Sequence, residues 1–172
     1  MDINTQKLEE SKILFEDFYR AQRDRIFRTV FATVGNFHDA EDATAEAFVR
    51  AHAQWDSLQT HPSPSGWVAI TAKNIFIDSH RKARRFQKKM MVLIEPEAAT
   101  NIDEGFDEAL HATISQLPMR QREVLVFRII LELNSQETAD TLGISVGAVG
   151  AHLNRALTTL RKKYTVQGKD LS

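Results

Sequence analysis

The chain has 172 residues, of which 42% are hydrophobic and none is cysteine, and its 22 basic and 23 acidic side chains leave a net charge of −1. Without cysteine there is no disulfide scaffold, thiol nucleophile or cysteine-ligated metal, which suits a reducing compartment. No apolar run reaches the roughly 18 residues that a membrane-spanning helix needs, and the N-terminus is too polar and acidic for a signal peptide. We therefore expect a cytoplasmic protein without membrane insertion.

The small net charge conceals strong alternation along the chain. Residues 1–72 carry a balance of −4, residues 73–89 of +6, residues 90–119 of −6 and residues 120–172 of +3. Charge runs are often only solvated faces, and neighbouring blocks of opposite sign can neutralise each other. An asymmetry of this size is still an argument about binding partners, which the motifs must decide.

Helical periodicity dominates the first part of the chain. Apolar side chains at residues 14–34 follow one stripe of a 3.6-residue period, and Gly35 with Asn36 ends that helix. Asp39 is the expected N-cap of a second helix. A loop rich in proline and serine at residues 61–66 precedes a long helix that carries the basic run. The buried face of the second helix is predicted to contain Ala40, Ala43, Ala47, Phe48, Ala51 and Trp55.

Residues 90–106 are predicted to form a linker. They contain no Lys or Arg, and after a short apolar stretch they are rich in acidic and turn-forming residues. A second helical unit is expected to begin near Phe106. The prediction is an all-α protein with two small helical domains, residues 1–89 and 107–172, joined by a flexible acidic linker.

The second domain carries the pattern of a helix-turn-helix. A short helix at residues 136–142, capped by Ser135, is followed by a glycine turn and by a longer helix from about residue 146 to 164, capped by Ser145. Another helix, at about residues 120–133, precedes them. The alternative is an ordinary helical hairpin that packs on a third helix.

The last of these helices is the candidate recognition helix. The second member of a helix-turn-helix enters the major groove of DNA, and basic side chains there neutralise phosphates and release counterions. Arg155 and the basic residues 161–163 favour this function over the plain hairpin. The candidate DNA-binding residues on this helix are Ala148, Ala151, His152 and Arg155.

The basic run of the first domain suits single-stranded or opened DNA. Cations follow phosphates there, while aromatic and amide side chains meet bases. For Trp67 and Phe76 we favour core packing, and for Asn74 a structural hydrogen bond explains the residue equally well. The candidate DNA-binding residues of this domain are Lys73, Asn74, Asp78, Arg81, Lys82, Arg84 and Arg85.

The preceding helix begins with a cluster of acids. Asp39, Glu41, Asp42 and Glu46 either stabilise the helix dipole or form a docking surface for a basic protein partner. The six histidines show no metal-ligand spacing, and no glycine-rich phosphate loop is present. We therefore expect no catalysis, no cofactor and no metal.

The order of these motifs resembles the extracytoplasmic-function sigma factors, which are promoter-specificity subunits of bacterial RNA polymerase. The resemblance extends from about residue 14 to residue 164. Any one of the motifs is weak, but all of them in this order and spacing are specific. They are Asp39-Ala40-Glu41-Asp42 with Phe48 and Arg50, Trp67 with Asn74 and Asp78, residues 117–125, and residues 142–147.

The resemblance implies a chain that binds core RNA polymerase and directs initiation at promoter DNA. Residues 39–52 would grip the clamp of the largest subunit, and residues 55–85 would open the promoter and read the minus-ten element. The linker would thread toward the active-site cleft and the RNA exit path. The last domain would sit on the flap of the second-largest subunit and read the minus-thirty-five element. An anti-sigma factor becomes a candidate partner. The implied polymerase-binding residues are Asp39, Glu41, Asp42, Glu46 and Arg50.

The sequence departs from the family pattern in two places. Ala45 stands where the family usually has Gln on the clamp-binding helix, and residues 148–152 lack the polar and cationic side chains usual on the recognition helix. Gly147 and Gly150 each cost roughly 1 kcal/mol in a helix interior relative to Ala. We expect binding to the upstream element to be weaker or less salt-dependent than usual, with more reliance on the first domain. The alternative function is a helix-turn-helix regulator that binds duplex DNA without polymerase.

Overall fold

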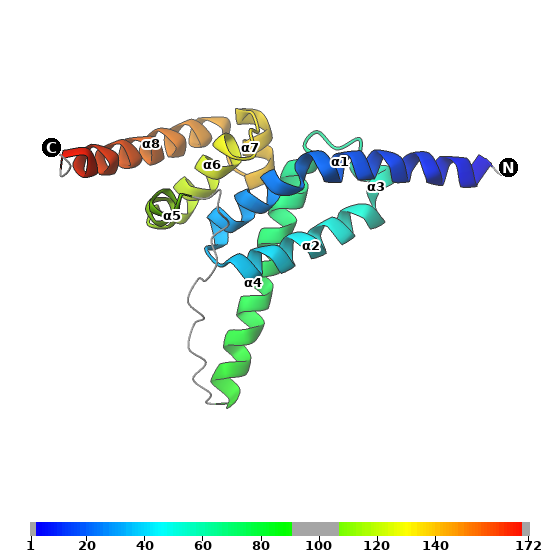
Figure 1. Ribbon diagram of the computed structural model, residues 1–172, viewed down its shortest axis with the longest axis horizontal. Helices are drawn as coiled ribbons and strands as arrows, with labels where there is room; N and C mark the ends of the chain where they lie inside the picture. The colour runs from blue at the N-terminus through cyan, green and yellow to red at the C-terminus, as the bar shows by residue number, and fades with distance from the viewer. Residues whose placement is uncertain (1–2, 91–106, 170–172) are drawn as a thin grey trace.

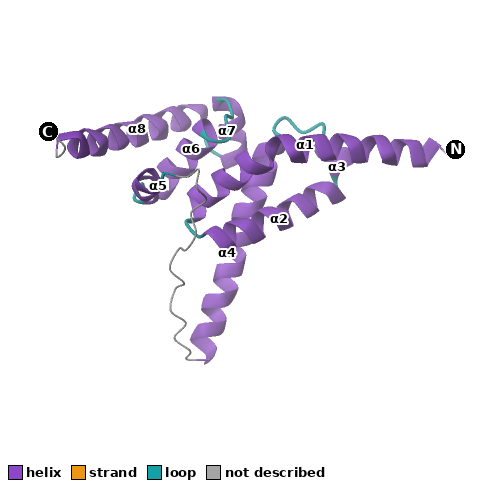
Figure 2. Cartoon of the chain, viewed as in Figure 1, coloured by secondary structure: helices purple, strands orange, loops and turns teal. Residues whose placement is uncertain are grey.

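The computed structural model describes residues 3–90 and 107–169, and within these ranges the chain is helical and contains no strand (Figure 1, Figure 2). The prediction of an all-α fold is confirmed. The N-terminal unit, residues 3–90, contains α1 (Ile3–Val34), α2 (Phe37–Ala53), α3 (Trp55–Leu58) and α4 (Pro64–Met90). The C-terminal unit, residues 107–169, contains α5 (Glu108–Ser115), α6 (Met119–Ile129), α7 (Ser135–Leu142) and α8 (Val146–Lys169). Apart from Met90, the predicted linker lies outside the described residues, and no helix within them is long and apolar enough to cross a membrane.

The boundary between α1 and α2 is set by a glycine and an asparagine. Gly35 takes a left-handed conformation, with φ of +83°, which glycine adopts without strain, so α1 ends at Val34. The extended backbone of Asn36 lets its Oδ1 accept a hydrogen bond from the backbone N–H of Asp39 at 3.0 Å. The prediction of Asp39 as the cap is wrong. Asp39 lies in the first turn, where its charge still faces the positive end of the helix dipole.

The N-terminal unit is held together by small and aromatic side chains of α2. All residues of the predicted buried face are buried, but Trp55 begins α3 instead of continuing α2, and the alanines of α2 let α1 and α4 approach closely. The Trp55 ring completes an aromatic cluster with Phe15 and Phe18, at centroid distances of 5.3 and 4.9 Å. Aromatic pairs at such distances add to the stabilisation from burial itself. The alanines of this face, each at most 3% exposed, are Ala40, Ala43, Ala47 and Ala51.

The helix-turn-helix begins with a capping box. The Oδ1 of Asn134 accepts from the N–H of Glu137 at 2.9 Å, and Oε2 of Glu137 accepts from the N–H of Asn134 at 2.7 Å. Ser135, predicted as the cap, is the first helical residue instead. α6 ends at Ile129 rather than near residue 133, because the chain must turn before Asn134 can cap α7.

The turn into the recognition helix agrees with the prediction. Gly143 takes the left-handed conformation, with φ of +65°, that ends α7. Ser145 then caps α8, since its Oγ accepts a hydrogen bond from the N–H of Ala148 at 3.1 Å. α8 extends to Lys169, beyond the predicted end near residue 164.

The two units pack on each other, a question that the sequence left open. α1 contacts α5 and α6, α4 contacts α7, and the buried apolar side chains of both units form one cluster. At the interface the ring of Phe31 stacks on that of His111, with centroids 4.4 Å apart and planes 12° from parallel. The described residues therefore form one body in which the two units are in contact, and we call this arrangement closed.

Arg122 of α6 fastens this closed body through backbone carbonyls. Its guanidinium donates to the carbonyl oxygens of Thr33 at 3.1 Å and Leu117 at 3.2 Å, and also to that of Ser115. Thr33 and Ser115 lie in the last turns of α1 and α5, where the negative ends of the helix dipoles favour a cation. Burial lowers the pKa of Arg122, while the neighbouring Glu123 opposes this shift.

Candidate nucleic-acid and polymerase-binding surfaces

The C-terminal half of α4 projects from the body and carries the basic run (Figure 1). Every side chain from Asp78 to Phe86 is exposed, so the predicted cations of this stretch face solvent. Lys88 and Lys89 add two more exposed cations in the last turn. An exposed helix with cations along its length can follow a phosphate backbone. The predicted DNA-binding cations on this half are Arg81, Lys82, Arg84 and Arg85.

A pocket of about 440 Å³ opens where the first half of α4 meets the end of α2. Asn74 and Asp78, one helical turn apart, are exposed on its wall, and neither side chain has a hydrogen-bond partner among the described residues. The half-buried indole of Trp67 lies beside them. An aromatic ring with an amide and a carboxylate provides a stacking surface and groups that pair with base edges. The lining residues are Arg50, Ala53, Gln54, Trp67, Thr71, Asn74, Ile75 and Asp78.

Arg50 belongs to this pocket as well as to the acidic face of α2. The sequence assigned it to polymerase binding, but the structure places it opposite Asn74 and Asp78 on the pocket wall. Its Nη2 also lies 2.5 Å from Oε1 of Glu46, an exposed pair one turn apart on the same helix. Arg50 is thus positioned to contribute a cation to the pocket.

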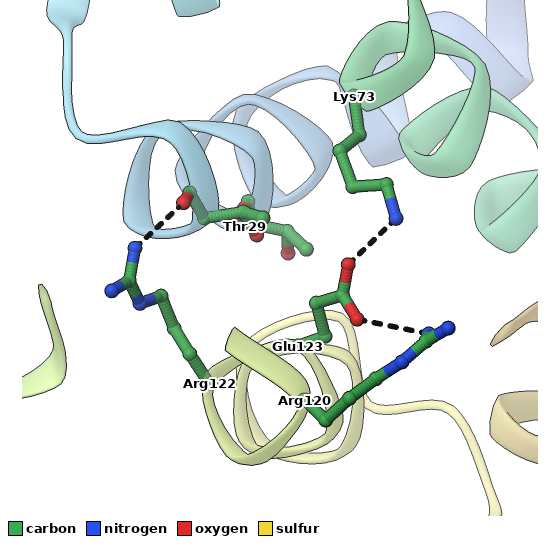
Figure 3. A network of polar contacts seen from close by, with 6 residues as sticks. Thr29, Lys73, Arg120, Arg122 and Glu123 are labelled. Carbon is green, nitrogen blue, oxygen red and sulfur yellow. Dashed lines mark hydrogen bonds and ion pairs between the residues drawn. The ribbon is translucent and has the colours of Figure 1, made fainter. Parts of the chain in front are cut away.

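Lys73 is placed differently from the other predicted DNA-binding residues. Its ammonium turns toward α6 and lies 2.6 Å from Oε1 of Glu123, and its side chain is only 13% exposed (Figure 3). Arg120 lies 3.1 Å from the second oxygen, Oε2, of the same carboxylate. In the closed body Lys73 therefore has an internal anionic partner.

The acidic start of α2 forms the predicted polymerase-binding face. Glu41, Asp42 and Glu46 are exposed, and Asp39 is half-buried with Oδ2 4.0 Å from Nε2 of His80 on α4. Among the described residues, these carboxylates form no other ion pair than the Asp39–His80 contact and the Glu46–Arg50 pair within α2. The surface is therefore available to a basic partner.

A groove of about 750 Å³ beside this acidic face escaped the sequence reasoning. It lies between α1 and α2, with aromatic rings on its floor and Glu41 and Arg23 among its lining residues. Val49 is 69% exposed and lies one turn from the exposed Ala45. These two apolar residues outside the buried stripe of α2 were the sequence feature that could have indicated the groove. The aromatic residues that line it are Phe15, Tyr19, Phe27, Phe37 and Phe48.

The recognition helix presents few charged groups on the predicted face. Ala151 and Arg155 are exposed, and Ala148 is half-buried. His152 is half-buried too, and its Nδ1 is covered without a hydrogen-bond partner among the described residues. Lys163, from the basic end of the helix, donates to Oε1 of Gln116 after α5. Of the four predicted residues, Arg155 is the one that offers an exposed cation.

Comparison with known families identifies both units. Residues 18–86 match the family described as Sigma-70 region 2, and residues 107–160 match the family described as Sigma-70, region 4. The first match contains α2 to most of α4, and the second contains the helix-turn-helix. Both regions occur in this chain in the same order as the two helical units.

Individual relatives agree with this assignment. The chain is 28% identical over 165 residues to the ECF RNA polymerase sigma factor SigW of Bacillus subtilis, which covers 87% of this chain and 88% of that protein. It is 26% identical over 162 residues to an RNA polymerase sigma-E factor of Streptomyces avermitilis, covering 91% and 87%.

Solved structures share the fold. The sigma factor RpoE of Bartonella quintana, in complex with the anti-sigma factor NepR, aligns with a TM-score of 0.73 at 20% identity, over 88% of this chain and 97% of that one. CnrH, in complex with the cytosolic domain of CnrY, aligns with a TM-score of 0.64 at 19% identity, over 94% of both chains. The two regional matches and the RNA polymerase sigma factors that are similar in sequence along most of this chain lead to one conclusion. The chain belongs to the sigma-70 family and is an extracytoplasmic-function sigma factor, a promoter-specificity subunit that directs transcription initiation.

Proposed function

We propose that this sigma factor opens promoter DNA along one face of α4. Asn74, Asp78 and Trp67 receive an unpaired base of the minus-ten element, and the exposed cations follow the phosphates of the same strand. The observation that supports this most is the continuity of the pocket with the projecting basic half of α4. The cations in question are Arg81, Lys82, Arg84 and Arg85.

Core RNA polymerase docks on the acidic face of α2 in this proposal. Glu41, Asp42 and Glu46 offer exposed charge to the clamp of the largest subunit, and the adjoining groove accepts apolar side chains. Ala45 replaces the Gln usual in the family, so this position contributes contact area rather than hydrogen bonds. Arg50 divides its role between this face and the base pocket.

The C-terminal unit reads the minus-thirty-five element as duplex and sits on the flap of the second-largest subunit. Arg155 provides the exposed cation of the reading face, while Ala148 and Ala151 permit close approach and contact with base methyl groups. His152, with its ring half-buried, contributes less than a free cation would. Recognition of this element is therefore weaker than usual, and the chain depends more on the N-terminal unit.

We divide the chain into residues 1–89 for clamp docking and minus-ten recognition, 90–106 as linker, and 107–172 for the upstream element. The acidic composition of the linker suits a channel built to hold nucleic acid, where its carboxylates mimic the charge of RNA. The protein works in the cytoplasm without catalysis or a cofactor of its own. An anti-sigma factor is a candidate partner, because the sigma factor RpoE, which shares this fold, is solved in complex with the anti-sigma factor NepR.

The test is transcription by core polymerase with the purified chain on a genomic promoter library. Selective initiation that needs both components supports the proposal, whereas tight promoter binding without core polymerase would favour a stand-alone regulator. On a promoter selected in this way, Asn74→Ala should lower initiation by about fivefold or more, since a lost base contact costs roughly 1–3 kcal/mol.

The matched control is Asn4→Ala, which removes another exposed helical asparagine from α1. It should leave initiation unchanged. A template with the minus-ten region already unpaired separates base capture from melting, and Asn74→Ala should still be defective on it. Initiation by Asn74→Ala equal to that of the control would contradict the assignment of the pocket.

A further inference from the structure

Glu123 is an unusual acid because it is almost completely buried, with 1% of the residue exposed. Its two carboxylate oxygens are held by cations from two different directions (Figure 3). Oε1 accepts from Nζ of Lys73 on α4, and Oε2 accepts from Arg120 on its own helix. Lys73 lies 50 positions away in the sequence and belongs to the other unit.

Burial makes this pair dependent on the closed arrangement. A buried carboxylate is costly unless it is paired and hydrogen-bonded. The side chain of Arg120 is 53% exposed, whereas that of Lys73 is 13% exposed. Of the two ion pairs of Glu123, the one with Lys73 is therefore the one that is shielded from water. When the two units separate, the ion pair between Glu123 and Lys73 breaks, and the ammonium of Lys73 becomes free to bind another anion.

Lys73 also immediately precedes Asn74, on the helix assigned to promoter DNA. The other candidate cations of α4 are exposed, and Lys73 differs because its ammonium is already paired with a carboxylate. We propose that Glu123 is an internal competitor of promoter phosphate. In the closed chain it withholds Lys73 from DNA, and separation of the units on polymerase releases Lys73 to the strand at the Asn74 pocket. This inference rests on the proposed function.

A second ion pair across the same interface provides a matched control. Arg25 of α1 lies 3.2 Å from Glu132, and the two side chains are 40% and 64% exposed. Exposed pairs contribute little because water and salt screen them. The same Glu-to-Gln substitution can therefore be made at a buried and at an exposed position of one interface.

The first experiment measures closure without DNA. Because the chain has no cysteine, Ser57→Cys and Gln136→Cys place one dye on each unit of the full-length protein. Glu123→Gln leaves the ammonium of Lys73 buried without an anion, so the ratio of open to closed chain should rise at least about tenfold, seen as lower energy transfer. Lys73→Gln breaks the same pair from the more exposed side and should also lower transfer, whereas Glu132→Gln should not.

The second experiment measures binding of a labelled single-stranded oligonucleotide by the same full-length variants at several salt concentrations. Glu123→Gln should bind more tightly than the parent chain, and its salt dependence should be steeper by about 0.7, the value for one additional phosphate contact on a single strand. Lys73→Gln should open the chain without either gain. This difference separates release of Lys73 from opening alone.

Unchanged energy transfer in both Glu123→Gln and Lys73→Gln would overturn the inference. If Glu123→Gln fails to fold, Lys73→Gln still tests whether the ion pair holds the two units together. If Glu123→Gln opens the chain but the salt dependence of its oligonucleotide binding equals that of the parent chain, Glu123 does not compete with phosphate for Lys73. Both results leave the proposed function standing, since that fails only if the parent chain with core polymerase does not initiate selectively.

Discussion

Replacement of Gly66 by alanine tests whether close packing holds the two units together. Gly66 is buried in the first turn of α4. A Cβ at this position would lie 2.6 Å from Oγ1 of Thr141 and 3.1 Å from Cδ1 of Leu133, both in the C-terminal unit, and 2.7 Å from Oγ of Ser63. Separations below 3 Å force atoms to shift, so in the closed body the side chains of Thr141 and Leu133, or the segments that carry them, must move to admit the methyl group.

The magnitude follows from two opposing effects. Overpacking of a well-packed core costs about 1–3 kcal/mol. Replacing a helical glycine by alanine recovers roughly 0.5–1 kcal/mol, in the open and the closed chain alike. Because Thr141 and Leu133 are close only in the closed chain, the part of the cost that they cause falls on closure, whereas the contact with Ser63 is present in the open chain as well. Because the gain from replacing glycine is the same in the open and the closed chain, it cancels in the closure equilibrium, and we expect Gly66→Ala to destabilise the closed arrangement relative to the open one by up to about 3 kcal/mol.

The assay combines urea unfolding with hydrogen exchange of α4 and α7. Gly66→Ala should lower the unfolding midpoint and speed exchange where the helices meet, and adding Thr141→Ala should restore part of the loss by removing Oγ1. Gly150→Ala is the matched control, since a Cβ there meets nothing within 4 Å, and it should stabilise the protein by roughly 0.5–1 kcal/mol. If Gly66→Ala were as stabilising as Gly150→Ala, the reasoning about closure would be refuted.

Three further predictions concern the C-terminal unit. Asn134→Ala should cost about 1 kcal/mol in urea unfolding, while Ser135→Ala should change stability by less than about 0.5 kcal/mol, because Asn134 is the cap. Burial, and the charge of Arg122, lower the pKa of His111 from 6.5, so its contribution to stability is present above pH 6.5 and is lost as the pH falls through the lowered value. His111→Phe keeps a ring on Phe31 but does not titrate, so its urea midpoint should fall less than the parent's on acidification. Arg122→Lys should cost about 1–3 kcal/mol, since an ammonium cannot reproduce the fork of bonds to three carbonyls, and exchange at the end of α1 should report it.

The fold was predictable where local patterns determine it. The alanine face of α2 and the cap at Ser145 were predicted from periodicity and capping preferences, which act within one turn of the chain. The two wrong caps, Asp39 and Ser135, lie next to or near an asparagine that also caps well. Which of two neighbouring residues caps the helix depends on which of them has the extended backbone after the preceding turn, as Asn36 and Asn134 do. The amino-acid composition of the segment does not reveal that position.

The sequence predicted most residues of the candidate site, but it did not predict their burial or their partners on other helices. The sequence identified Asn74 and Asp78 at helical spacing, but Arg50 joins their pocket only through the packing of α2 on α4. Likewise, the burial of Lys73 depends on Glu123, far along the chain, and the partly covered ring of His152 depends on how α8 packs. Such environments arise from contacts between elements, which no local pattern encodes.

The chemistry of the interface itself argues that the two units are built to come apart. Arg122 and Glu123 are adjacent, yet one reaches the carbonyls at the end of α1 and the other the ammonium of Lys73 on α4. An interface that only had to be stable would gain as much from apolar side chains, because replacing buried ion pairs by well-packed apolar residues is often neutral or stabilising. Charged groups regain water when the units separate, whereas apolar surface would then be exposed at a cost. The ion pairs within this partly apolar interface therefore lower the cost of opening, which suits the proposal that the two units act at separate promoter elements.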